Sequence, residues 1–163
     1  MNIATKKLPT ILGYAVIAAT VGMVLRAIEE RVGADGTVLQ PLDEADARAT
    51  FARLRKDGFD ALAIVLVHGW KYRDHEMRLA MLARDAGFAQ VSVSHEVAPL
   101  IRLVPRGDTS VVDAYLSPVL RRYTDTLQAG LPETESLRFM QSNGGLAEVG
   151  AFRGKDAILS GPA

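Results

Sequence analysis

The chain has 163 residues, and its lysines plus arginines equal its aspartates plus glutamates at 19 each. This length suits one ordinary domain or part of a larger one. The balanced charge argues against a nucleic-acid partner, which needs a basic surface. The sequence contains no cysteine, which excludes disulfides, thiolate catalysis and cysteine-based zinc sites and fits a reducing compartment.

An apolar run over residues 11–25 follows Lys6 and Lys7. The run is shorter than the roughly 20 residues that cross a bilayer as a helix, and no small-x-small cleavage site follows before Arg26. Four interpretations stay open: a signal-peptide core, a short membrane anchor, a buried helix, or a terminus unrelated to the rest of the chain. We expect no membrane partner, with membrane association through this run as the minor alternative.

The next segments predict a short extended pair followed by a helix. Two extended pieces flank the Gly/Asp turn at residues 33–36. Asp43 can cap a helix in which Ala47, Phe51 and Leu54 share one face at helical spacing. We therefore expect this helix to pack through one apolar side.

The continuous apolar run at residues 61–67 predicts a buried parallel strand, and residues 90–94 predict the next strand. A helix is expected between them, over residues 74–86. Its expected apolar side consists of Met77, Ala80, Met81 and Leu82. Strands that alternate with helices in this way are typical of βαβ units, so the predicted fold class is α/β with an open sheet and long helices.

The C-terminal third predicts a long helix and a third strand. Thr109 or Ser110 can cap the helix, and Pro118 inside it predicts a kink, because proline removes an amide donor. The expected apolar side of this helix is formed by Val112, Tyr115, Val119, Tyr123 and Leu127. Residues 137–140 predict a further buried strand of the same sheet.

His95 and Glu96 directly follow the strand predicted at residues 90–94, which is where open α/β sheets place their ligands. A histidine can transfer protons near neutral pH, and an adjacent carboxylate can tune it. No catalytic residue is assigned beyond these two candidates, and the structural alternative is that both only cap the next segment. His68, His75 and His95 lack metal-ligand spacing such as H-E-x-x-H, so we expect no metal site.

Two glycine turns are candidates for a ligand cleft, because glycines allow backbone amides to approach an oxyanion or phosphate. The candidate nucleotide- or substrate-binding residues are Ser142, Asn143, Gly144, Gly145, Ser160 and Gly161. Neither serine lies in a G-x-S-x-G motif, which excludes a serine-triad hydrolase. Arg102 and Arg106, near Asp108, can clamp an anionic substrate or form a solvated rim.

Three sequence stretches carry a resemblance to a known family. They are Val-Pro-Arg-Gly-Asp-Thr at residues 104–109, Asp-Ala-Tyr-Leu at 113–116 and Arg-Gly-Lys-Asp-Ala-Ile-Leu-Ser-Gly-Pro-Ala at 153–163. The chain resembles the hydantoinase/oxoprolinase family, and is closest to those members that open 5-oxo-L-proline to L-glutamate with ATP. The resemblance extends back to about Glu30 and leaves out the first 25 or so residues.

The resemblance implies a fold, a reaction and a location. It implies part of an actin-like ATPase (ribonuclease H-like) architecture, in which two α/β lobes hold Mg-ATP between glycine loops. ATP would phosphorylate the lactam oxygen, and water would then open the ring. It also implies 5-oxo-L-proline and ATP as partners of the intact enzyme, a role in glutathione metabolism and a cytoplasmic location.

The chain departs from the family pattern at the phosphate-binding loops. The sequence contains no Asp-x-Gly-Gly-Thr. We therefore expect an internal section of such an enzyme that binds no ATP tightly, is inactive alone, and associates with itself or with the missing lobes. The expected divisions are an unrelated apolar terminus at residues 1–27, the end of the family's N-terminal domain at 28–103 and the truncated start of its next domain at 104–163.

Two other functions stay open. One is a non-catalytic, membrane-tethered interaction domain that keeps the scaffold without the ATP loops. The other is a section of a related hydantoinase or ketone carboxylase subunit.

Overall fold

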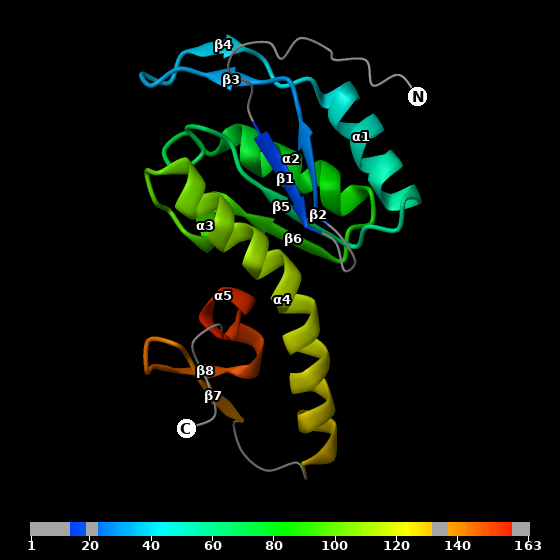
Figure 1. Ribbon diagram of the computed structural model, residues 1–163, viewed down its shortest axis with the longest axis vertical. Coiled ribbons are helices and arrows are strands. Elements are labelled where there is room, and N and C mark those ends of the chain that lie inside the picture. The colour runs from blue at the N-terminus through cyan, green and yellow to red at the C-terminus, as the bar shows by residue number, and fades with distance from the viewer. Residues whose placement is uncertain (1–13, 19–22, 132–136, 158–163) are drawn as a thin grey trace.

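The protein is described here from a computed structural model, which describes residues 14–18, 23–131 and 137–157 (Figure 1). Near the N-terminus, β1 (Tyr14–Ala18) and β2 (Met23–Ala27) pair antiparallel, and β1 lies beside β5 (Figure 1). The interpretations that required a helix in residues 11–25 are therefore wrong for the described part of that run. Its valines, isoleucine and tyrosine are residues that favour strands. None of the helices in the described ranges is both long enough and apolar enough to cross a membrane.

The extended pair and the first helix follow the prediction. β3 (Arg31–Val32) pairs antiparallel with β4 (Val38–Gln40), and α1 spans Glu44–Lys56. The Asp43 side chain caps α1, because its Oδ1 accepts a hydrogen bond from the Asp46 amide at 2.9 Å. The predicted face of α1 is buried, with Ala47 and Phe51 fully inaccessible.

The centre of the molecule is a βαβ unit. β5 (Ala61–Ile64) and β6 (Gln90–Val93) run parallel, with α2 (Asp74–Asp85) between them in the chain. This confirms both predicted strands and the α/β class, although each strand is shorter than its predicted range. The main core joins α1, β5, α2 and β6, and includes Phe51, Leu54, Leu62, Ile64, Leu79, Leu82, Phe88 and Val93.

The buried side of α2 differs from the prediction. Met77 and Met81 are 51% and 52% exposed, whereas Glu76 and Leu79 are fully buried. Helical spacing places Met77 and Met81 on one face of α2 and Glu76 and Leu79 on another. The neighbouring elements cover the face that carries Glu76. The glutamate is tolerated inside because its carboxylate is hydrogen-bonded, as described below.

After the short helix α3 (Ser94–Val97), the long helix α4 runs from Leu103 to Gly130. It begins before the predicted caps, and the hydroxyls of Thr109 and Ser110 instead bond the carbonyls four residues earlier, at 2.8 and 2.7 Å. Pro118 lies inside the helix as predicted. The predicted apolar side is wrong for Tyr115, Val119 and Tyr123, which are exposed.

The buried side of α4 carries small and polar residues: Arg106, Gly107, Ser110, Asp113, Ala114, Ser117 and Thr124. This side faces β5, β6 and the C-terminal segment. Most of its polar groups hydrogen-bond to one another, to backbone carbonyls of α4 or to the strand ends, which allows them to be buried, although Nε of Arg106 has no hydrogen-bond partner among the described residues.

The C-terminal segment forms a separate unit against α4 (Figure 1). β7 (Arg138–Met140) pairs antiparallel with β8 (Leu146–Glu148), followed by the 3₁₀ turn η1 (Val149–Ala151) and α5 (Gly154–Ala157). The prediction that residues 137–140 form a strand is confirmed. The prediction that this strand is buried in the central sheet is wrong, because it pairs locally with β8 and is partly exposed.

Candidate functional site

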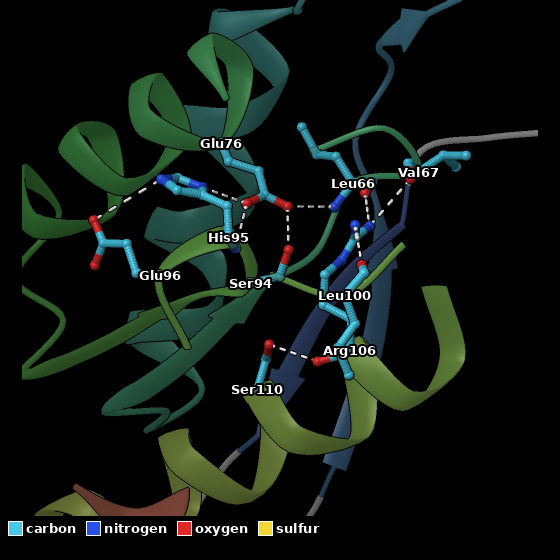
Figure 2. Close-up of polar contacts among 9 residues, drawn as sticks. All are labelled: Leu66, Val67, Glu76, Ser94, His95, Glu96, Leu100, Arg106 and Ser110. Carbon is cyan, nitrogen blue, oxygen red and sulfur yellow. Dashed lines mark hydrogen bonds and ion pairs between the residues drawn. The ribbon is translucent and has the colours of Figure 1, made fainter. Parts of the chain in front are cut away.

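A buried carboxylate joins the carboxyl ends of the two parallel strands (Figure 2). Glu76 Oε1 accepts hydrogen bonds from the Leu66 amide at 2.8 Å, after β5, and from the Ser94 hydroxyl at 2.6 Å, after β6. Its Oε2 accepts from the His95 amide at 3.2 Å and lies 2.7 Å from His95 Nδ1. The Glu76 side chain of α2 therefore links the ends of β5 and β6, at the edge of the sheet where open α/β folds usually bind ligands.

His95 is oriented by this carboxylate. An ionised carboxylate can only accept hydrogen bonds, so Nδ1 of His95 donates to Glu76 and Nε2 points away from it. Nε2 lies 4.0 Å from Oε1 of Glu96, and the side chains of His95 and Glu96 are 5% and 50% exposed. The sequence predicted Glu96 as the carboxylate that tunes His95, but the hydrogen-bonded partner is Glu76, and Glu96 is a more distant second neighbour. Glu76, His95 and Glu96 form a row that we call the acid–histidine row.

Sequence reasoning missed Glu76, although the sequence carried a signal for it. Glu76 lies on the same helical face as Leu79, Ala80 and Ala83, all of which are buried. A glutamate within such an apolar stripe must find partners or be costly to bury. The turn after β5 makes room for it, because a Cβ at Gly69 would lie only 2.2 Å from Glu76 Oε1.

The two arginines predicted as an anion clamp have different environments. Arg106 is fully buried, and its guanidinium donates to the carbonyls of Leu66, Val67 and Leu100, the last at 3.2 Å (Figure 2). Burial lowers the pKa of Arg106, and the negative charge of Glu76 opposes this. Arg102 is exposed at the start of α4. Arg106 thus closes the ends of β5 from the inside, and only Arg102 faces solvent.

The Gly144–Gly145 turn uses its amides internally. The Ser142 amide donates to the Asp156 carbonyl at 2.7 Å, the Gly144 amide to the Gln141 carbonyl at 2.9 Å, and the Gly145 amide to Asn143 Oδ1 at 2.8 Å. These three amides are therefore engaged with protein acceptors instead of a ligand. Ser160 and Gly161, the other predicted cleft residues, lie outside the described residues.

A cleft of about 680 Å³ separates β6 from the C-terminal unit, with α4 as its third wall. Glu96 lines this cleft, as do Asp113, Arg121 and Arg153. The carboxylate of Asp113 is held by hydrogen bonds from the Ser92 hydroxyl at 2.7 Å and from the Ser117 hydroxyl and the Lys155 amide, both at 3.2 Å. The cleft thus combines a fixed carboxylate with the charged side chains of Arg121 and Arg153, and it meets the acid–histidine row at Glu96.

Two family models match the chain. A model described as the hydantoinase/oxoprolinase N-terminal region matches residues 2–87, and one described as hydantoinase/oxoprolinase matches residues 106–163. The chain belongs to the hydantoinase/oxoprolinase family. The first match includes the apolar N-terminal run, which the sequence analysis placed outside the resemblance.

Relatives in this family include several 5-oxoprolinases. The chain is 42% identical to the 5-oxoprolinase of Saccharomyces cerevisiae over 77% of its own length, and 40% identical to 5-oxoprolinase 1 of Arabidopsis thaliana over the same share. It is 41% identical to the caprolactamase alpha subunit of Pseudomonas jessenii over 85% of its length. The chain spans only 10% of the length of these two 5-oxoprolinases and 21% of that subunit.

Solved structures confirm the predicted fold class. The ATP-dependent caprolactamase from Pseudomonas jessenii matches 84% of this chain with a TM-score of 0.77 and 38% identity, and the chain covers 21% of it. The nucleotide-free acetone carboxylase structure matches 83% with a TM-score of 0.65, at 21% identity, and the chain covers 20% of it. The second likeness concerns the fold alone.

Among the described residues of this hydantoinase/oxoprolinase chain, the predicted glycine turn does not form a phosphate-binding loop. The sequence lacks Asp-x-Gly-Gly-Thr, and the amides of its Gly144–Gly145 turn are engaged. Across residues 14–18, 23–131 and 137–157, no group of three or more histidines, aspartates or glutamates is arranged to hold a metal ion. No phosphate-transfer step is therefore assigned to residues of this chain.

Proposed function

We propose that this chain is one section of an ATP-dependent cyclic-amide hydrolase of the 5-oxoprolinase type, which converts 5-oxo-L-proline to L-glutamate. The observation that carries the proposal is the identity of about 40% to 5-oxoprolinases from three organisms. Their matched part is about a tenth of each enzyme, so the activity belongs to a longer polypeptide or assembly. Mg-ATP and the lactam are the proposed co-substrates of that whole, and its cytoplasmic location stays a prediction.

Within this proposal, the acid–histidine row is a candidate for proton transfer at the cleft. Glu76 keeps the proton of His95 on Nδ1, so Nε2 is available as an acceptor toward Glu96. Glu96 is half-exposed and lines the cleft, which gives it access to a water molecule or a substrate. His95 and Glu76 would then act as positioning residues for Glu96.

The isolated chain is expected to show no lactamase activity, because it supplies no phosphate-binding loop. A coupled assay of ADP release by the purified chain, with and without 5-oxo-L-proline, tests this expectation. Substrate-dependent release by the chain alone would contradict it.

A segment exchange tests the proposed reaction itself. The matching 128 residues of the Saccharomyces cerevisiae 5-oxoprolinase are replaced with the corresponding part of this chain. The chimera is expected to release ADP when 5-oxo-L-proline is added. Glu96→Gln in the chimera is expected to lower kcat and to leave the free energy of unfolding nearly unchanged. A folded chimera whose ADP release does not increase with 5-oxo-L-proline would count against the proposal.

A second candidate is the opening of a different lactam. It is favoured by the caprolactamase likeness, which reaches 41% identity in sequence and a TM-score of 0.77 in structure. Offering caprolactam and hydantoin to the same chimera, and a matched exchange into the caprolactamase alpha subunit, separates the two candidates. Preference for caprolactam in both chimeras would replace the 5-oxoprolinase assignment.

A further inference from the structure

Leu66, which lies just after β5, is held between two buried side chains of opposite charge (Figure 2). Its amide donates a hydrogen bond to Glu76 Oε1 at 2.8 Å, and its carbonyl accepts one from the guanidinium of Arg106. Glu76 belongs to α2 and Arg106 to α4, and both side chains are fully buried. Two helices that are separate in the sequence thus place a negative and a positive charge on either side of one residue.

Arg106 has only neutral hydrogen-bond partners. Its guanidinium donates to the carbonyls of Leu66, Val67 and Leu100, and its Nε has no partner among the described residues. Carbonyls satisfy donors but do not balance a charge, and an unbalanced charge is costly to bury. The negative charge of Glu76 opposes the lowering of the Arg106 pKa that burial causes. Glu76 therefore helps to make a buried cation tolerable at this position.

Glu76 needs a positive charge in return. Its four hydrogen bonds come from the amides of Leu66 and His95, the hydroxyl of Ser94 and Nδ1 of His95. The balancing charge can be Arg106, or it can be His95 with a proton on both ring nitrogens. If it is Arg106, His95 stays neutral, its one ring proton is on Nδ1, and Nε2 can accept a hydrogen bond.

We propose that Arg106 is a positioning residue of the acid–histidine row: its charge balances that of Glu76, so that His95 stays neutral with its proton on Nδ1. This inference rests on the function proposed above for that row, and it adds a member from α4. The sequence analysis named Arg106 as a clamp for a bound anion. Under this proposal the anion that its charge serves is a carboxylate of the protein itself.

Arg106→Gln tests the proposal, because it keeps an amide donor for the strand-end carbonyls and removes the charge. Without the cation, the Glu76–His95 pair is expected to take up one proton from solvent. The proton either protonates Glu76, which then donates to Nδ1, or makes His95 doubly protonated. Nε2 carries a proton in both cases.

The measurement is the protonation of each ring nitrogen of His95, from long-range proton–nitrogen NMR spectra at neutral pH. In the wild type we expect an unprotonated Nε2. In Arg106→Gln we expect that this signal is lost. Arg106→Lys keeps a positive charge on a flexible side chain and is expected to retain the signal.

His75 is the internal control. Its Nδ1 lies 2.7 Å from the buried carboxylate of Glu30, which makes an equivalent pair to which Arg106 donates no hydrogen bond. The ring of His75 is expected to be the same in the wild type and in Arg106→Gln. The chain has three histidines, so replacing each with glutamine assigns the signals.

The proposal is overturned if His95 is doubly protonated in the wild type, if folded Arg106→Gln keeps an unprotonated Nε2, or if Arg106→Lys loses it. Circular dichroism and the His75 signal show whether Arg106→Gln folds. If it does not, the double variant Glu76→Gln/Arg106→Gln decides, because removing both charges leaves neither unbalanced. The double variant is expected to have the higher urea midpoint, and a lower one would overturn the proposal. These measurements need no lactamase activity, so their failure is distinguishable from failure of the proposed function.

Discussion

Replacing Glu76 should lower the free energy of unfolding more than replacing any other aspartate or glutamate of the central βαβ unit with its amide or with alanine. Glu76→Ala leaves four buried donors without their acceptor: the amides of Leu66 and His95, the Ser94 hydroxyl and His95 Nδ1. Each buried unsatisfied donor costs ~1–3 kcal/mol, and breaking a buried charged network costs ~3–5 kcal/mol. We expect a loss of about 3–5 kcal/mol, because the hydroxyl can rotate and water can enter the cavity.

This loss is large against the stability of an ordinary domain, which is about 5–15 kcal/mol. Glu76→Gln keeps the shape and one acceptor oxygen but turns its amide nitrogen toward donors, so we expect a loss of about 2 kcal/mol or more. Urea unfolding followed by circular dichroism measures both variants, with the slope of the transition as a check on two-state behaviour.

The matched control is Glu96→Gln, which makes the same chemical change at a half-exposed carboxylate. It should change the free energy of unfolding by no more than about 0.5 kcal/mol. If Glu76→Ala costs no more than this control, Glu76 does not hold the two strand ends together, and the argument for the acid–histidine row fails with it.

The remaining predictions concern three glycines and one ion pair. Gly69→Ala should destabilise the fold by ~1–3 kcal/mol in urea unfolding, because its Cβ would lie 2.2 Å from the buried carboxylate, whereas Gly130→Ala meets no atom within 4 Å and should be neutral. Gly154→Ala places a Cβ 2.7 Å from a backbone nitrogen of α4, so hydrogen exchange should show faster exchange in α5 than in β5. The hydrogen bond from Arg78 lowers the pKa of Glu44, so its contribution to stability is present above the ordinary carboxyl value of 4.5 and is lost as the pH falls through the folded pKa. As the pH is lowered from above 4.5 through the folded pKa of Glu44, the urea midpoint should therefore fall less in Arg78→Ala than in the wild type. Equal falls in both proteins would show that Arg78 does not lower the pKa of Glu44.

Most of the local structure was predictable because its signals are local. Asp43 caps α1 through a hydrogen bond to an amide three residues later, which needs nothing beyond the adjacent chain. The apolar run that contains β5 is too short for an ordinary helix and is bounded by Gly58 and Gly69, which indicates a buried strand. The apolar N-terminal run gave a weaker signal, since such a run fits a helix or two strands until its neighbour is known.

The site was less predictable, because its members come from three separate elements. The sequence pointed to His95 at the end of a strand, and the structure places it there. It did not indicate that the partner of His95 is Glu76 on α2, 19 residues earlier. It also suggested that Arg106 could meet an anion, whereas the guanidinium points inward to strand-end carbonyls.

For this protein, the sequence by itself determined most of the helices and strands between β3 and β7, which residues share a face of each, and to which family the motifs belong. Only the tertiary structure decided which face of each helix is buried. The buried face of α2 includes Glu76 and that of α4 includes Arg106 and Asp113, because these side chains find hydrogen-bond partners on other elements. Such partners offset the cost of burying a charge, and they are set by the packing of distant segments.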